Sequence, residues 1–126
     1  MATLNLNQGT LNGRAVSGDD IRFLFTFPFD MTGWGGTLIV RTANTLAGTA
    51  LATLIDAGRG GTGATLLTIT PGASTSTVSG WLPASATYGN AYTTIYHQLQ
   101  LIDASSKKRS WIGGEVTLEP GLVATA

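Results

Sequence analysis

Cysteine is absent from this 126-residue sequence, histidine occurs once, and no long apolar run interrupts it. Without cysteine there is no disulfide framework, no thiolate nucleophile and no sulfur ligand for a metal ion. No apolar stretch approaches the roughly 20 residues that span a bilayer. The first residues, Met1 to Asn5, lack the basic end and apolar core of a signal peptide. We therefore expect a soluble protein that is made inside the cell.

Charge is also scarce. Seven basic residues balance seven acidic ones, so the formal net charge is zero and no net field attracts nucleic acid or an anionic membrane. Only 11% of the residues are charged and the mean hydropathy is +0.20, which is low polarity for a free monomer. We expect other subunits to cover part of the surface.

The four phenylalanines stand on alternate positions of one short segment. Ile21 leads Phe23, Phe25, Phe27 and Phe29, so a strand here would point all five side chains to one side of a sheet. Burial of each ring stabilises the fold by roughly 2 kcal/mol. This segment therefore predicts the strand that anchors a β-core.

The rest of the chain alternates short apolar stretches with turns rich in Gly, Pro, Asn, Ser and Asp. Strands are predicted at about residues 21–28, 37–42, 50–55, 64–70, 76–82, 92–102 and 110–118. This spacing indicates an all-β fold, an antiparallel immunoglobulin-like β-sandwich of about seven strands. Residues 43–55 also fit helical spacing, although Gly48 and three threonines weaken that alternative.

Domain organisation follows from the same pattern. Residues 1–17 are predicted to form an extended amino-terminal arm or an extra strand, in which Leu4 and Leu6 alternate. Residues 18–126 are predicted to form one β-sandwich domain. Its last two strands should form a hairpin whose connection begins at Asp103, a residue suited to capping a turn.

Five motifs then follow one another in a specific order. They are Gly18-Asp19-Asp20-Ile21-Arg22, Asp30-Met31-Thr32-Gly33-Trp34 with a strand ending at Arg41, Trp81-Leu82-Pro83-Ala84-Ser85-Ala86-Thr87, Tyr96-His97-Gln98-Leu99-Gln100-Leu101-Ile102-Asp103, and Ile112-Gly113-Gly114-Glu115-Val116-Thr117-Leu118. Over about residues 18–120 they resemble the landmarks of a small β-sandwich domain of tailed bacteriophages. That domain is similar to the amino-terminal module of upper baseplate proteins and to many small phage tail proteins.

The resemblance implies a structural module, not an enzyme, that attaches fibres, receptor-binding proteins or neighbouring copies to a virion. Its implied partners are other virion proteins and copies of itself, with no nucleic acid, membrane, small-molecule substrate or cofactor. Its implied location is the virion, after assembly in the host cytoplasm. The sequence departs from the family pattern in a longer segment before Gly18 and in His97, where relatives often carry tyrosine.

Residues that could carry chemistry have simpler structural interpretations. His97 is the only possible catalytic or metal-binding histidine, but its inward position between Ile95 and Leu99 favours a packed, hydrogen-bonded side chain. Asp19, Asp20, Asp30 and Asp56 are candidate calcium ligands. They lack the regular spacing of a calcium loop, which favours turn-capping aspartates.

The segment Gly58-Arg59-Gly60-Gly61-Thr62-Gly63 spells the pattern G-x-G-x-x-G of dinucleotide-binding proteins. That site requires a helix directly after the glycines, whereas the next residues, 64–70, are typical of a strand. We therefore interpret residues 58–63 as a loop that contacts neighbours in an assembly, with Arg59 as a contact candidate.

The other predicted partner contacts lie elsewhere in the chain. Lys107, Lys108 and Arg109 form the only basic cluster, either as a solvated turn or as a site for a partner's acidic group. Trp111 is predicted to point outward, where a partner or a loop would cover it. The arm contributes Leu4 and Leu6.

The predicted function is that of a virion structural protein in a tail, a baseplate or a fibre attachment, with capsid decoration as a variant. The alternative from another class is a receptor- or carbohydrate-binding sandwich, for which the sequence offers no concave aromatic site. The sequence shows no convincing combination of a nucleophile, a general acid or base and a residue that orients it, so an enzyme is not predicted.

Overall fold

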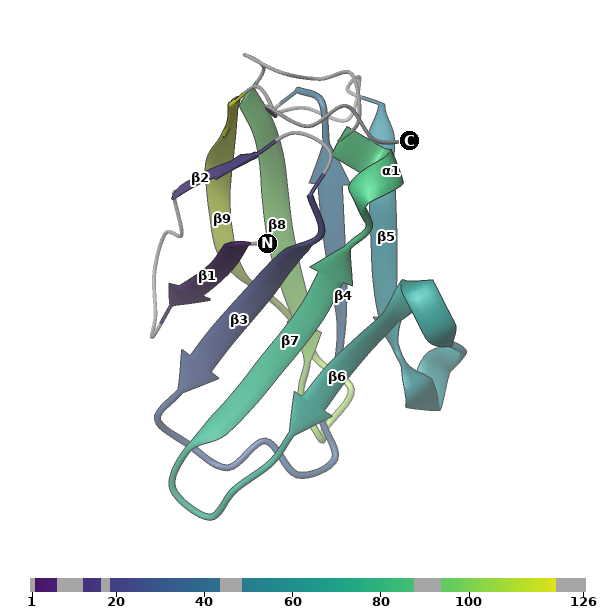
Figure 1. Cartoon of the computed structure of the whole chain (residues 1–126). Coiled ribbons are helices and arrows are strands. Elements are labelled where there is room, and N and C mark those ends of the chain that lie inside the picture. The colour runs from purple at the N-terminus through teal and green to yellow at the C-terminus, as the bar shows by residue number, and fades with distance from the viewer. Residues whose placement is uncertain (1, 7–12, 17–18, 44–48, 88–93, 120–126) are drawn as a thin grey trace.

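The computed structural model describes residues 2–6, 13–16, 19–43, 49–87 and 94–119 (Figure 1), and for residues 2–6 and 109–112 it describes the backbone only. The strands of these residues are β1 (Ala2–Leu6), β2 (Gly13–Val16), β3 (Ile21–Phe27), β4 (Gly35–Arg41), β5 (Ala50–Asp56), β6 (Leu66–Thr70), β7 (Ser76–Leu82), β8 (Thr94–Ile102) and β9 (Lys108–Glu119). The helical elements are one-turn pieces, η1 (Ala57–Arg59), η2 (Gly63–Thr65) and α1 (Ala84–Thr87).

The strands join into one sheet that folds into two layers. Its order is β1-β3-β7-β6-β5-β4-β8-β9-β2 within the described residues. Strands β1, β3, β7 and β6 form one layer and the other five strands form the second, as Figure 1 shows. The two end strands, β1 and β2, contact each other, and the short β5–β6 pairing joins the layers on the other side. The sheet is therefore nearly closed into a barrel.

The structure confirms the all-β class and finds a strand at each of the seven predicted places. It corrects the predicted seven-strand antiparallel arrangement in two respects. The described residues contain nine strands, and three neighbouring pairs, β1–β3, β2–β9 and β5–β6, run parallel. The two additional strands come from residues 2–6 and 13–16, within the predicted arm or extra strand. Residues 50–56 form a strand, and residues 44–48 of the alternative helix lie outside the described residues.

The core lies between the two layers. The inward side chains of β3, namely Ile21, Phe23, Phe25 and Phe27, are completely buried. They pack against buried side chains of the opposite layer, which include Leu38, Val40, Ile95, Leu99, Leu101, Val116 and Leu118. The His97 side chain is buried among them, with its ring centroid 5.0 Å from that of Phe23. The predicted packed, inward-facing position of His97 is confirmed, but its buried Nδ1 atom makes no hydrogen bond within the described residues, so hydrogen bonding at that atom is not confirmed.

Phe29 departs from the predicted ladder of four rings. Pro28 has no backbone N–H, and β3 ends just before it, at Phe27. Phe29 is therefore half-buried beyond the strand, with its ring 5.7 Å from Phe27 and 5.4 Å from Trp34. The fourth phenylalanine supports the loop that carries Trp34 instead of extending the strand face.

Candidate functional site

Trp34 is held by a tight turn between β3 and β4. The carboxylate of Asp30 accepts hydrogen bonds from the backbone N–H of Thr32 at 2.9 Å and from its hydroxyl at 2.6 Å. The Thr32 hydroxyl and N–H together lower the pKa of Asp30. Gly33 follows with φ +80°, a conformation that favours glycine. These constraints place the half-buried indole of Trp34 at the start of β4.

An ion pair lies next to it, where β5 ends. Asp56 Oδ1 accepts hydrogen bonds from Arg59 Nε at 2.8 Å and from the backbone N–H of Gly36 at 2.9 Å. Arg59 Nη2 also donates to Thr37 Oγ1 at 2.8 Å. Burial acts to raise the pKa of Asp56, but the Arg59 and Gly36 hydrogen bonds and the positive charge of Arg59 leave it below its ordinary value. The pair joins the loop after β5 to the beginning of β4.

Gly35 makes room for this ion pair. A Cβ atom at Gly35 would lie 2.9 Å from Asp56 Oδ1 and 3.3 Å from Arg59 Nε. A larger residue would therefore push Asp56 and Arg59 away from β4. In the sequence Gly33-Trp34-Gly35, the Trp34 indole is therefore flanked on both sides by residues that have no side chain.

The turn between β8 and β9 forms a second structured loop. Asp103 Oδ1 accepts hydrogen bonds from the backbone N–H groups of Ser105 and Lys107, at 2.9 and 3.0 Å. Ser106 has φ +65°, and its N–H donates to the Asp103 carbonyl. The predicted turn-capping role of Asp103 is confirmed.

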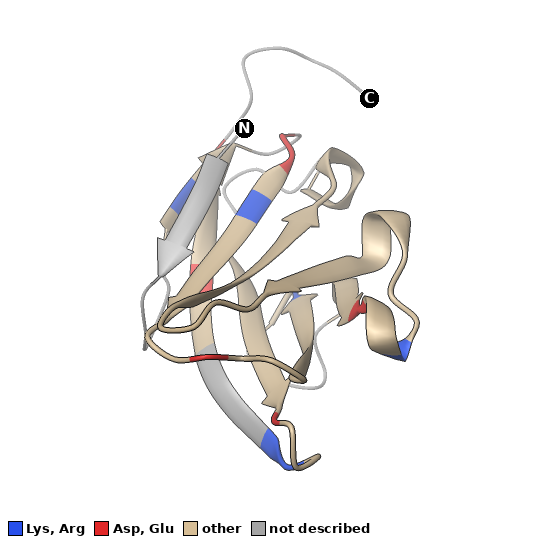
Figure 2. Cartoon of the chain, turned by 90° about the horizontal axis from the view of Figure 1, so that it is seen from below, with Lys and Arg blue, Asp and Glu red and all other residues tan. Residues whose placement is uncertain are grey.

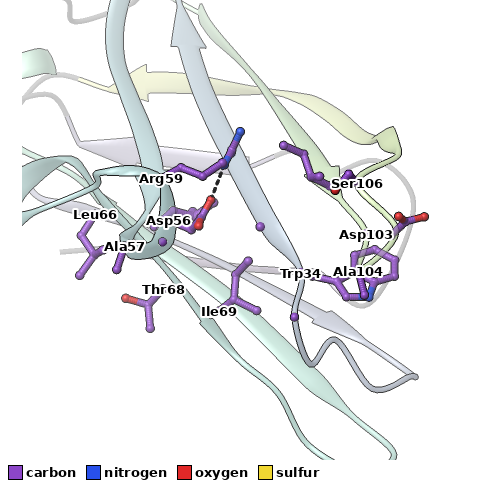
Figure 3. Close-up of a pocket in the computed structure, with 15 residues that line it drawn as sticks. Trp34, Asp56, Ala57, Arg59, Leu66, Thr68, Ile69, Asp103, Ala104 and Ser106 are labelled. Carbon is purple, nitrogen blue, oxygen red and sulfur yellow. Dashed lines mark hydrogen bonds and ion pairs between the residues drawn. The ribbon is translucent and has the colours of Figure 1, made fainter.

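These loops surround a groove of about 530 Å³ at one end of the barrel (Figure 3). One wall consists of β6 residues and the loop after β5, with Leu66, Thr68, Ile69 and Arg59. The facing wall contains Trp34, Asp103, Ala104 and Ser106. The volume lies within the roughly 300–1,000 Å³ range of sites that hold small ligands. The groove is thus a concave site whose walls carry one aromatic side chain, Trp34, and one ion pair, in which the charges of Asp56 and Arg59 neutralise each other.

The groove borders an edge of β6, not one of its faces. Thr68 and Ile69 both line the groove, although neighbouring residues of a strand point to opposite faces. On one side, residues 68–70 pair with β7, and on the other side β5 pairs only with Leu66 and Leu67. Among the described residues, no strand pairs with that second edge of residues 68–70. Their backbone edge therefore opens onto the groove.

The structure places one of the predicted contact residues, Arg59, in this groove. Lys107 and Lys108 are exposed in the nearby turn and at the start of β9, but they do not line the groove. Leu4 and Leu6 lie in β1 opposite Phe23 and Phe25, and Arg109 and Trp111 lie in β9. The side chains of these four residues lie outside the described part, so Trp111's predicted outward orientation stays a prediction.

Trp34 and Ile69 are two of the several groove residues that the predicted contacts omit. Trp34 lies in the segment Asp30-Met31-Thr32-Gly33-Trp34, and its position between Gly33 and Gly35 is a signal that sequence reasoning could have used. Ile69 gives no such signal, because it is one apolar residue of an ordinary strand pattern. Only the divergence of β5 from β6 exposes it to a groove.

The other sequence motifs serve local structure. Asp20 Oδ1 accepts a hydrogen bond of 2.7 Å from the backbone N–H of Ala84, at the start of α1. The glycine-rich residues 58–63 lead through η2 into β6, and not into a long helix. Among the described residues, no three His, Cys, Asp or Glu side chains are grouped so that they could hold a metal ion. No helix in the described part of the chain is long and apolar enough to cross a membrane.

Comparison of the sequence with models of protein families and with curated proteins finds no match.

Proposed function

We propose that this protein is a non-enzymatic structural subunit of a tailed-bacteriophage virion that acts through protein-protein contacts. Its place in the particle is the tail, the baseplate or a fibre attachment, and its two-layer sheet is a variant of the family's immunoglobulin-like sandwich. Capsid decoration is a variant within the same class. The proposal rests on the ordered motifs over residues 18–120 and on the character of the surface.

The observation that carries the proposal is the low charge of the sheet's outer faces. Outward positions of β3, β7 and β6 include five hydroxyl side chains and one charged side chain, namely Thr26, Thr68, Thr70, Thr77 and Ser79, and Arg22. Those of β4, β5 and β8 include Thr37, Ile39, Thr53, Gln98 and Gln100. Figure 2 shows charged residues scattered over the described part without a broad patch of one sign. Such faces suit a subunit with neighbours better than a free monomer, for which a surface with about 25–35% charged residues favours solubility.

The motif residues themselves also support a structural role. Asp20 connects the lead-in to β3 with α1, Asp30 closes the turn before Trp34, and Asp103 holds the β8–β9 turn. Each of these carboxylates accepts a hydrogen bond from a backbone N–H. Their oxygens are thus used to fix loops at the two ends of the barrel, where neighbouring subunits can recognise them.

Light scattering tests the proposal with purified protein. We expect a symmetric oligomer, or a complex with other virion proteins, because outer faces with so little charge need cover. A stable, monodisperse monomer that joins none of these proteins would contradict the assembly role.

An exposed tryptophan favours a second candidate, a receptor- or carbohydrate-binding module. Trp81 is 43% exposed, and it lies directly opposite Arg22 on the outer face of the β3–β7 pair. An exposed indole beside a guanidinium can hold a sugar ring or a receptor side chain. A glycan-binding screen of the protein and of Trp81→Ala tests this candidate. Binding that Trp81→Ala abolishes supports it, and an absence of hits counts against it.

A further inference from the structure

The open edge of β6 is a candidate position for an additional strand. In strand addition, an extended segment pairs with unpaired backbone N–H and C=O groups, and alternate side chains enter neighbouring pockets. The edge of residues 68–70 offers such groups, and Pro71 ends it because proline has no N–H. The edge is therefore short, and side chains of the groove must supply part of the binding.

The two facing walls limit what can enter the groove. Trp34 and Ala104 stand across from the edge of β6, as Figure 3 shows, so the edge of another folded sheet would collide with them. The apolar surface comes from Trp34, Leu66 and Ile69. Asp56 and Arg59 neutralise each other. The third charged side chain of the groove, Asp103, already accepts two backbone N–H groups of its own turn. The groove therefore suits a segment without charged side chains.

The chain contains a segment of this chemistry. Residues 120–126, Pro-Gly-Leu-Val-Ala-Thr-Ala, follow β9 and include no charged side chain. They cannot reach the groove of their own molecule. The groove adjoins the start of β9, and the 11 steps from Lys108 to Glu119 extend about 36 Å along the strand. Seven extended residues span at most about 24 Å. The end of β9 lies at the opposite end of the barrel from the β8–β9 turn (Figure 1), and that turn lines the groove.

We propose that residues 120–126 of a second copy bind in the groove as a strand added to the edge of β6. Each copy then donates a segment from one end and accepts one at the other. This head-to-tail contact forms a ring if the rotation between copies closes, and a filament if it does not. The inference rests on the proposed assembly function, for which it names the partner as a second copy of the chain.

Peptide binding to the full-length protein tests the contact directly. A synthetic peptide with the sequence of residues 120–126 is titrated to millimolar concentration while the NMR signals of backbone amides and tryptophan indole N–H groups are followed. We expect saturable shifts at Thr68, Ile69 and the Trp34 indole. A peptide with Leu122→Asp and Val123→Asp should bind at least about tenfold more weakly, because it brings two charges into an apolar groove. No shift at these groove residues with the unaltered peptide overturns the proposal.

Two neighbouring turn residues provide a matched pair of protein variants. Ala104 and Ser105 are both exposed, but only Ala104 lines the groove. We expect Ala104→Trp to weaken peptide binding at least about tenfold by filling the groove, and Ser105→Trp to leave it unchanged. Circular dichroism verifies that both variants remain folded. Equal effects of the two variants on binding contradict the proposed site.

Crosslinking tests whether whole subunits make the same contact. The natural sequence has no cysteine, so Ala104→Cys combined with Val123→Cys gives a clean pair, with Ser105→Cys and Val123→Cys as the control. Under mild oxidation we expect covalent dimers and longer ladders mainly from the first pair. Ladders of equal yield from both pairs contradict the contact. If the ladders form but the protein is absent from virions, this inference survives and the proposed phage function fails.

Discussion

Asp56 and Arg59 form an ion pair of 2.8 Å that joins the loop after β5 to the start of β4. Their side chains are 14% and 38% exposed, so the carboxylate is the more deeply placed partner. The same Asp56 oxygen accepts the backbone N–H of Gly36. This arrangement fixes one wall of the groove at the point where the two layers of the sheet separate.

Removal of this carboxylate should destabilise the fold. We expect Asp56→Ala to lower the free energy of unfolding by about 1–3 kcal/mol, because the Gly36 N–H and Arg59 lose their acceptor. Urea denaturation measures the change. Thr53→Ala, an exposed position on the same strand, is the control and should stay within about 0.5 kcal/mol of the unaltered protein.

Low pH should also remove the contribution of the Asp56 carboxylate to the free energy of unfolding, because the carboxylate becomes protonated. The folded-state pKa of Asp56 lies below its ordinary value of 3.8, so between the two values the unfolded state binds more protons and stability rises with pH. The contribution is complete above the ordinary value and is lost as the pH falls through the folded-state pKa. We expect Asp56→Asn to lose less stability than the unaltered protein between pH 5 and pH 2, measured by thermal unfolding. Identical pH profiles would show that Asp56 is not linked to folding.

A buried hydroxyl connects the turn before Trp34 to β7. Ser76 is completely buried, and its Oγ donates to the Phe29 carbonyl at 2.8 Å and accepts from the Met31 N–H at 3.0 Å. We expect Ser76→Ala to cost about 1–3 kcal/mol, because both backbone groups lose a partner. Ser79→Ala, at a half-exposed position of the same strand, should have little effect. Equal denaturation midpoints for the two variants contradict this role of Ser76.

Two glycines in the sheet should respond oppositely to alanine. A Cβ atom at Gly80 would lie 2.5 Å from Leu54 Cδ1, whereas one at Gly113 would meet no described atom closer than 3.7 Å. We expect Gly80→Ala to destabilise the protein by about 1–3 kcal/mol through overpacking. Gly113→Ala should be neutral or stabilise it by up to about 1 kcal/mol through the unfolded chain. Calorimetric melting temperatures compare the two, and a loss at Gly113 as large as at Gly80 refutes the packing argument.

The strands could be predicted because their signals are local. Alternation of side chains in residues 21–27 and 94–102 depends only on neighbouring positions, and it correctly places the buried residues Phe23, His97 and Leu99. Turn residues such as Asp103 also act within a few positions of themselves. The predicted end of this strand, at about residue 28, is within one residue of the observed end at Phe27. The place of Phe29 on the strand face was wrong, because the alternation continues through Phe29 whereas Pro28 ends the ladder.

The parallel pairs and the groove could not be predicted in this way. β1 pairs with β3, and β2 pairs with β9. The local sequence of each of these strands does not indicate which strand it will pair with. The groove depends on where β5 separates from β6, after Asp56 and Leu67, which is a property of the folded layers. Sequence reasoning therefore found Arg59 as a loop residue without its neighbours Trp34 and Ile69.

The central claim is that the protein is a structural part of a virion, and labelling of intact particles tests it most directly. Antibody against the protein, detected by gold in electron micrographs, is applied to purified phage particles from the source of the sequence. We predict label at the tail, concentrated at the baseplate or the fibre attachments. Label on the head would favour a capsid-decoration role over a tail role. Purified particles without any label would contradict the structural role.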